Sequence, residues 1–210
     1  LPARKILFRR PDGRIMKSFK SYTDRSCRYF ERPGAVNTRQ VLEMVSQRAA
    51  LQDISRIVIP TYSGKSALAA AKMIDPAKLV AVTTVYGFKK PNEQLMTEAT
   101  RRRLLAMGIQ VVTAAHAFGG VGRSVRRKLE TYQVDEIIAY TLRIFGQGTK
   151  VVVEAALMAT DAGCVRVDEN IISTGGSSSG LDTALVLQPA NTHSFLDVKI
   201  REVLCKPANF

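Results

Sequence analysis

The segment RIVIPTYSGKSALAAAKMI, residues 56–74, contains the pattern that decides the fold. RIVIP is a short run rich in β-branched residues and is long enough only for a buried strand, whereas SALAAAKMI is rich in alanine, which has the highest helix propensity. Thr61, Tyr62, Ser63 and Gly64 lie between the two runs. The segment therefore predicts a strand, a polar turn and a helix in succession.

The same alternation recurs twice downstream. LVAVTTV (79–85) and IQVVTAA (109–115) predict strands, while EQLMTEATRRRLLAMG (93–108), closed by Gly108, and RKLETYQVDEIIAYTLRIFG (127–146) predict helices, the last as one helix or two. Strands and helices that alternate at this interval imply right-handed crossovers. We therefore expect an α/β fold with three layers, doubly wound around a mostly parallel sheet.

The flanking segments extend this pattern. Upstream, apolar residues at helical spacing predict a helix that starts at Asn37, with Asn37 and Gln40 as a capping box, and ends near Leu51. Downstream, KVVVEAALMATDAG predicts a helix because of its length and its terminal glycine, and NIISTGG and ALVLQPA predict two closing strands.

The composition fits one soluble domain. A chain of 210 residues with 46% hydrophobic residues can bury one sizeable core, so we expect a basic extension over residues 1–28 and an α/β domain over residues 29–210. Charged residues interrupt every apolar run, and no transmembrane segment is expected. Cys27, Cys164 and Cys205 are scattered, which argues against a disulfide framework and against a metal site.

The charge is concentrated at the start of the chain. The net charge is +13, and residues 1–32 hold ten Lys or Arg against three acids. Such a segment attracts polyanions, so a larger protein or ribonucleoprotein assembly, RNA and anionic lipid are the expected partners of residues 1–28, with a solvated tail as the alternative. An Arg-rich, acid-poor start that lacks Met resembles a processed mitochondrial sequence, which predicts the mitochondrial matrix, or otherwise the cytoplasm.

Two loops of the predicted sheet suit an anion. Ligands of doubly wound sheets lie beyond the carboxyl ends of the strands. PTYSGKSA offers the hydroxyls of Thr61, Ser63 and Ser66, and Gly64 allows close approach of the backbone. GGSSSGLDT, residues 175–183, offers three serines among glycines. PTYSGKSA lacks the spacing of a Walker A loop, so nucleotide hydrolysis is not implied.

No catalytic group emerges from the sequence. His116 follows a predicted strand but has no carboxylate neighbour in sequence, so we expect a structural histidine rather than a general base. Glu154 and Asp161 lie seven residues apart on one face of a predicted helix and are interpreted as structural charges. The basic runs 101–103 and 123–128 are interpreted as solvated helix faces, because no aromatic pattern accompanies them.

Several motifs carry a family resemblance. IVIPTYSGKSALAAA followed by LVAVTT resembles the C-terminal domain of pyruvate kinase. YFERPGAVNT, YGFKKP, HAFGGV, FGQGTKVVVEAALMATDAG and GLDTALVLQPANTHSFLDVKIREVLCKP are similar to a stand-alone family described as pyruvate kinase C-terminal-domain-like. The similarity runs from about Tyr29 to Pro207. Pyruvate kinase activity is excluded, because the catalytic barrel alone needs about 250 residues.

The resemblance implies a pocket for a flavin mononucleotide (FMN)-like ligand, with no assigned reaction. It carries over as cofactor-binding candidates Thr61, Ser63, Gly64, Ser66, Gly87, Phe88, His116, Gly175, Gly176, Gly180, Asp182 and Thr183. The chain has Ser179 where the family pattern has an arginine, and Gly119 where it has a serine. Loss of that arginine removes a bidentate phosphate contact, so a weaker ligand site is expected.

Three functions follow from these observations. The first is a phosphate-binding or FMN-binding accessory subunit of a mitochondrial assembly. The second keeps the fold without the ligand, as a structural subunit of a mitochondrial ribosome or respiratory complex. The third is an enzyme of phosphoryl or flavin chemistry.

Overall fold

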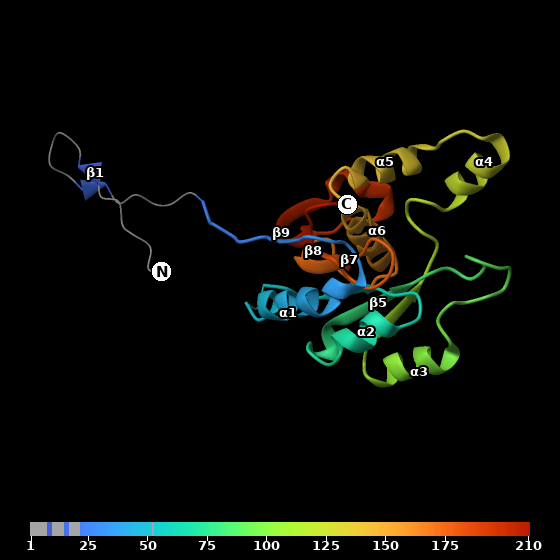
Figure 1. The fold of residues 1–210 in the computed structure, drawn as a ribbon, viewed down its shortest axis with the longest axis horizontal. Helices are drawn as coiled ribbons and strands as arrows, with labels where there is room; N and C mark the ends of the chain where they lie inside the picture. The colour runs from blue at the N-terminus through green and yellow to red at the C-terminus, as the bar shows by residue number, and fades with distance from the viewer. Residues whose placement is uncertain (1–7, 10–14, 17–21, 52) are drawn as a thin grey trace.

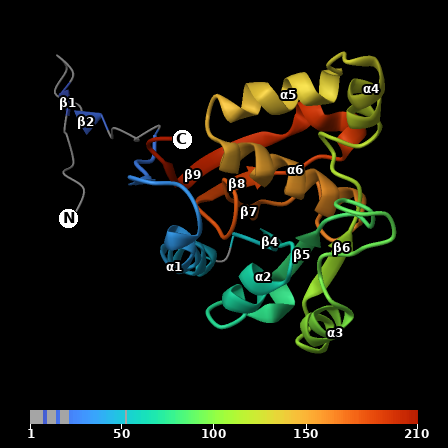
Figure 2. The ribbon, with the colours of Figure 1, turned by 45° about the vertical axis from the view of Figure 1, so that its right-hand side comes forward.

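The computed structural model describes residues 8–9, 15–16, 22–51 and 53–210 (Figure 1). One seven-stranded sheet crosses the domain in the order β3-β9-β8-β7-β4-β5-β6 (Figure 2). Its strands are β3 (Arg28–Phe30), β4 (Ile57–Pro60), β5 (Leu79–Thr83), β6 (Gln110–Thr113), β7 (Ile171–Gly175), β8 (Thr183–Gln188) and β9 (Lys199–Pro207).

Helices cover both faces of this sheet. One face packs against α1, α2 and α3, and the other packs against α6, with α5 lying outside α6 (Figure 2). The α-helices are α1 (Thr38–Ala49), α2 (Lys65–Ala70), α3 (Glu98–Ala106), α4 (Val121–Leu129), α5 (Val134–Arg143) and α6 (Gln147–Asp161). Short 3₁₀ turns are η1 (Ala35–Asn37), η2 (Pro76–Lys78) and η3 (Thr192–Asp197). The expected three-layer α/β architecture is confirmed.

The sheet is mostly parallel. Four of its strand pairs run parallel, namely β4 with β5 and β7, β5 with β6, and β3 with β9. The strand β8 is antiparallel to both β7 and β9. The pattern NIISTGG and ALVLQPA predicted β7 and β8, but β3 and β9 were not predicted.

The central strand β4 shows why both faces need helices. Ile57 and Ile59 join the core beneath α1 and α2, and Val58, between them, joins the core beneath α6. All three side chains are fully buried. An alternating strand with apolar residues on both faces is what a parallel sheet covered on two sides requires.

The helix boundaries differ from the sequence predictions in identifiable ways. The helix predicted from residue 93 begins only at Glu98, because the Thr97 hydroxyl accepts a hydrogen bond from the Thr100 N–H and caps it there. The capping box at Asn37 is wrong, since the Asn37 amide donates to the carbonyl of Arg32 instead. Gly108 follows α3 with a φ of +84°, as a C-terminal glycine should.

Part of the basic extension lies within the described residues. Here β1 (Phe8–Arg9) pairs antiparallel with β2 (Ile15–Met16), a short ladder that the sequence did not predict. Arg28 lies opposite Cys205 in the main sheet, so the predicted boundary after residue 28 falls inside β3. Most of residues 1–21, with the charges expected to bind a partner, lie outside the described residues.

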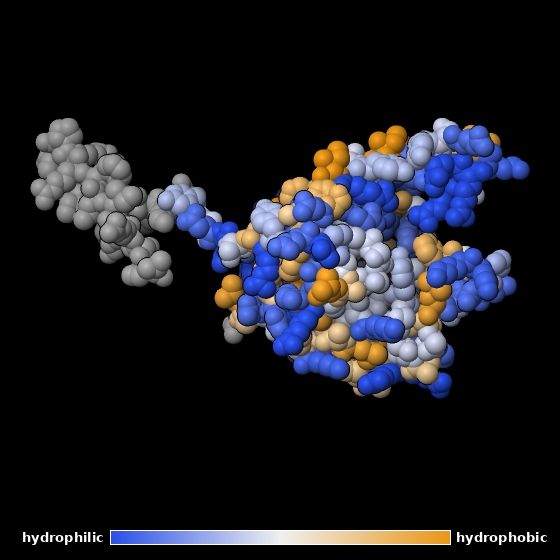
Figure 3. Space-filling model, in the orientation of Figure 1, coloured by the Kyte–Doolittle hydropathy of each residue, from blue (hydrophilic) through white to orange (hydrophobic). Residues whose placement is uncertain are grey.

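The basic residues of α4 have an aromatic neighbour that the sequence did not indicate. The Arg126 guanidinium lies 5.6 Å from the ring of Tyr132, which contacts Tyr140 edge to face. The helix α4 has no buried residue, in agreement with the prediction of a solvated helix face. Figure 3 shows hydrophilic residues over the region of α4 and apolar ones along the upper edge, over the region of α5. Among the described residues, no helix has the length and apolarity to cross a bilayer.

Candidate functional site

A cavity of about 360 Å³ lies where several strands of the sheet end. Residues that follow β4, β5, β6 and β7 meet there, and α6 contributes lining residues from Gln147 to Met158. The groups that line it from the predicted loops include Thr61, Ser63, Lys65, Ser66, Phe88, His116, Arg123 and residues 176–180. The loops PTYSGKSA and GGSSSGLDT therefore line one cavity, as expected from their places after β4 and β7.

The loop after β4 presents hydroxyls to the cavity and packs its glycine elsewhere. The buried Thr61 is fixed by its N–H, which donates to the Val82 carbonyl at 2.8 Å. Gly64 has a φ of +88°, and a Cβ there would lie 2.4 Å from the Thr100 side chain on α3. The structure thus gives Gly64 a role in turning the chain against α3. We expected Gly64 to leave room for a ligand, but Gly64 does not line the cavity.

The loop after β7 is held by a buried carboxylate. Asp182 accepts hydrogen bonds from the N–H of Gly34 at 2.8 Å, from the N–H of Ser177 at 3.0 Å and from the Thr183 hydroxyl at 2.8 Å. Asp182 and Thr183 are almost completely buried and lie outside the cavity lining. These two predicted site residues shape the loop that lines the cavity.

Gly175 also acts behind the cavity. A Cβ at Gly175 would lie 2.2 Å from the carbonyl oxygen of Gly148, and one at Gly148 would lie 2.0 Å from the Thr183 hydroxyl oxygen. The two glycines therefore let the first turn of α6 approach the ends of β7 and β8 closely. This contact brings the side chains of that helix to the cavity.

The helix α6 supplies a buried ion pair to the cavity. Lys150 and Glu154 both line it, although each residue is only 5% exposed. The Lys150 amine donates to Glu154 Oε2 at 2.5 Å, and Glu154 Oε1 accepts from the N–H of Phe118 at 3.1 Å. Burial lowers the pKa of the Lys150 amine, and the attraction of Glu154 opposes that shift.

His116 lies beside this pair. Its Nδ1 is 3.9 Å from Glu154 Oε2, which is beyond hydrogen-bond reach. Burial lowers the pKa of His116, against the opposing effect of Glu154, and Lys150 and Arg123 add to the lowering. The carboxylate beside His116 comes from α6, 38 positions later in the chain, so the search for a neighbour in sequence could not find it.

Aromatic rings form one wall of the cavity. The rings of Phe88 and His116 are stacked with centroids 4.9 Å apart, and Tyr62 extends the stack on the other side of Phe88 at 6.3 Å. The Arg123 guanidinium lies 5.8 Å from the Phe88 centroid. A Cβ at Gly119 would lie 2.6 Å from this guanidinium, so the glycine found where the family pattern has a serine leaves room for Arg123.

The lining of the cavity is strongly basic. Its cations are Lys65, Arg123, Arg143 and Lys150, whereas Glu154 is the single acid among the described lining residues. Ser179 also lines the cavity, at the position where the resemblance led us to expect an arginine. The four cations supply positive charge that the position of Ser179 does not. The lining therefore suits an anion.

The two polar loops of the cavity were predicted from the sequence, whereas the part that α6 and the end of α5 take in the lining was not. Arg143, Gln147 and Lys150 line the cavity and were not predicted, although the i, i+4 spacing of Lys150 and Glu154 is a signal for an ion pair on one helix face. Asp161 is not paired with Glu154. Its carboxylate instead accepts from the N–H of Thr192 and the amide of Asn191, both at 3.0 Å.

Gly87 is the remaining predicted site residue outside the cavity lining. It has a φ of +79°, and its N–H donates to the carbonyl of Glu93. Gly87 therefore turns the loop that carries Phe88. Of the predicted residues, Thr61, Ser63, Ser66, Phe88, His116, Gly176 and Gly180 line the cavity.

One comparison with known proteins bears on this arrangement. The family model described as "Pyruvate kinase, alpha/beta domain" matches residues 39–187. The match covers more than two thirds of the chain and includes the segments from β4 to β8 that form the cavity.

Proposed function

Because the chain belongs to the pyruvate kinase alpha/beta domain family, we propose that it binds a phosphate-bearing ligand with a planar ring, such as FMN. The observation that carries the proposal is the combination of four cations, serine hydroxyls from two loops and a stacked aromatic wall in one cavity. Phosphate oxygens accept hydrogen bonds from hydroxyls and cations, and a planar ring stacks on aromatic side chains. The volume of the cavity lies within the usual range for ligand sites.

The lining residues form two groups, one suited to the phosphate of the ligand and one suited to its ring. Ser63 on the loop after β4, Ser66 at the start of α2 and residues 177–179 all line the cavity and would hold the phosphate, together with Lys65. Phe88 and His116 would hold the ring. The helix α2 has only six residues, so the proposal rests on side chains rather than on its dipole.

A titration tests this proposal. FMN fluorescence should be quenched saturably by the protein, and riboflavin, which lacks the phosphate, should bind at least about tenfold more weakly. The double variant Ser63→Ala/Ser66→Ala should weaken FMN binding and leave riboflavin binding nearly unchanged. Ser124→Ala, an exposed serine on α4, is the matched control. Equal affinity for the two flavins would contradict a phosphate site.

We further propose that residues 1–28 attach the domain to a larger assembly, with the mitochondrial matrix as its compartment. The support is the density of positive charge in this segment, which suits RNA, anionic lipid or an acidic protein surface. An ultraviolet-visible spectrum of the purified protein separates this accessory role with a flavin from a structural role without one, because bound flavin absorbs where protein does not.

A further inference from the structure

We propose that Lys150 forms an imine with a phosphate-bearing aldehyde or ketone held in the cavity. The inference rests on the proposed function, because the same loops would bind the phosphate of this compound. It goes further in assigning a covalent reaction and a substrate class to the cavity.

The position of Lys150 is the first argument. Its side chain is 6% exposed and lines the cavity from α6. Within the described residues, the acceptor of its amine is Glu154 Oε2, which leaves two of the three donors of an ammonium group for a bound molecule. A carbonyl oxygen is an acceptor of the kind that these donors would orient.

The surroundings of Lys150 ease the loss of its proton. Burial lowers the pKa of the Lys150 amine, the contact with Glu154 opposes that shift, and Arg143 and Arg123, which line the same cavity, add to the lowering. The net direction is downward, so the neutral amine forms more readily than in a lysine surrounded by water. Lysines that form imines with carbonyl substrates are activated by burial and by neighbouring cations.

Glu154 is placed to move the proton. One of its oxygens faces the Lys150 amine, and the N–H of Phe118 holds the other at 3.1 Å, which fixes the carboxylate. A carboxylate in direct contact with the amine can take its proton and return it later. A buried ion pair adds little net stability to a fold, because the two charges lose their hydration. The position of this pair at the wall of a cavity is therefore better explained by a chemical role.

The step balances without an oxidant or a metal. Glu154 takes a proton from the Lys150 ammonium, and the neutral amine adds to the carbonyl carbon as the C–O π electrons move to oxygen. That oxygen gains one proton from the nitrogen and the other from Glu154, and it leaves as water. The product is a protonated imine on Lys150, with Glu154 again ionised.

Lys65 provides an internal comparison. It lines the same cavity but is exposed to solvent. Lys65 lacks the burial that distinguishes Lys150, whose side chain is 6% exposed. Selective reaction at Lys150 over Lys65 would therefore reflect burial rather than mere access to the cavity.

The experiment uses pyridoxal 5′-phosphate as a phosphate-bearing aldehyde and pyridoxal as its counterpart without phosphate. The full chain is incubated with each at neutral pH, reduced with borohydride and mapped by peptide mass spectrometry. We expect the adduct on Lys150, at a probe concentration at least about tenfold lower for the phosphate-bearing aldehyde. Inorganic phosphate should suppress it.

Variants keep the result interpretable. Lys150→Arg retains the positive charge beside Glu154 but offers no amine, so it should bind the phosphate-bearing aldehyde reversibly without a stable adduct. Reaction spread over exposed lysines while Lys150 stays unmodified would overturn the inference. If the probe binds saturably but forms no imine, the imine alone fails. If neither this probe nor FMN binds, the proposed function fails with it.

Discussion

Asp182 is the residue on which the loop after β7 depends. Its carboxylate is fully buried and accepts hydrogen bonds from two backbone N–H groups, on Gly34 and Ser177, and from the Thr183 hydroxyl. The sequence placed Asp182 in the site through the family resemblance. It could not assign the role, because Gly34 lies 148 residues away in sequence.

Removing this carboxylate should loosen the loop. We expect Asp182→Ala to lower the free energy of unfolding by about 3 kcal/mol, since buried donors lose a charged acceptor. Amide hydrogen exchange at Gly34 and Ser177 should accelerate before global unfolding. Asp197→Ala, in the exposed part of η3, should change neither quantity. Unchanged protection at both amides would show that Asp182 does not hold the loop.

The second prediction at the residue scale concerns His116 and the pH dependence of stability. Burial lowers its pKa in the folded state below the ordinary value of 6.5, so the unfolded chain binds a proton more readily. The free energy of unfolding should therefore fall as the pH drops from 6.5 towards the lowered folded value. Urea denaturation across this pH range should show a shallower decline in the free energy of unfolding for His116→Gln. The control His193→Gln, which replaces an exposed histidine, should show the same decline as the unmodified chain. A rise in stability on acidification would contradict this assignment.

At the scale of elements, the approach of α6 to the sheet brings Lys150 and Glu154 to the cavity. The sequence predicted the helix from its length and its terminal glycine. It did not predict how closely the helix approaches the sheet, because that depends on Gly148 fitting against Thr183, 35 positions later.

Gly148→Ala tests this close contact. Its Cβ would lie 2.0 Å from the Thr183 hydroxyl oxygen, so the helix must shift, at a cost of about 1–3 kcal/mol. FMN affinity should fall as well, because the shift carries Lys150 with it. Gly120→Ala is the control, since its nearest contact would be an ordinary 3.6 Å. Equal stability of the two variants, measured by urea denaturation, would contradict the account.

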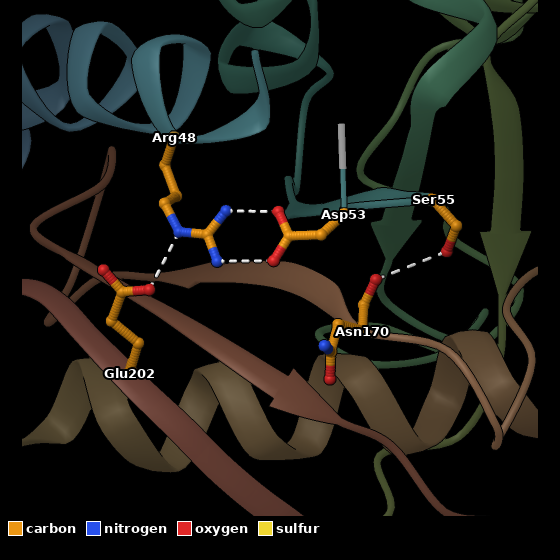
Figure 4. Close-up of polar contacts among 5 residues, drawn as sticks. All are labelled: Arg48, Asp53, Ser55, Asn170 and Glu202. Carbon is orange, nitrogen blue, oxygen red and sulfur yellow. Dashed lines mark hydrogen bonds and ion pairs between the residues drawn. The ribbon is translucent and has the colours of Figure 1, made fainter. Parts of the chain in front are cut away.

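An ion-pair cluster joins α1, the loop before β4 and the strand β9. Arg48 on α1 contacts both oxygens of Asp53 at 2.6 and 2.9 Å, and it donates to Glu202 on β9 at 2.8 Å (Figure 4). Nearby, the N–H and hydroxyl of Ser55 donate to the carbonyl of Asn170, which ties β4 to the start of β7 (Figure 4).

Arg48→Met should destabilise the fold by about 2 kcal/mol, because it leaves the largely buried Glu202 carboxylate without its partner. Arg39→Met removes a pair with Glu43 of which the arginine side chain is 85% exposed, and it should cost less than about 0.5 kcal/mol. Chemical denaturation of the two variants provides the comparison. Neither change should affect FMN affinity, since both lie outside the cavity lining.

At the scale of the whole molecule, local sequence patterns were sufficient to predict the three layers. They were not sufficient to predict β3 and β9 at one side of the sheet. The repeat of strand, loop and helix predicted β4 to β6 and their crossovers. The strand β9 has mixed polar and apolar residues, and it forms because β3 and β8 pair on either side of it. Pairing partners distant in sequence leave no periodic signal.

The basic extension should be separable from this fold. Deleting residues 1–26 leaves β3 intact, so the melting temperature should stay within a few degrees while binding to a uridine oligonucleotide weakens. Binding by the full chain should decline steeply with salt. A large loss of thermal stability with oligonucleotide binding retained would mean that the extension belongs to the core.

The most direct test of the central claim is a nuclear magnetic resonance titration of the isotope-labelled full chain with FMN. We expect the amides of residues 63–66 and 177–180 to shift together, with one dissociation constant, and Phe88 and His116 to shift with them. Riboflavin should perturb the aromatic pair more than the two loops. Saturable shifts confined to other surfaces, or no saturable shift at all, would contradict a phosphate site built from the loops after β4 and β7.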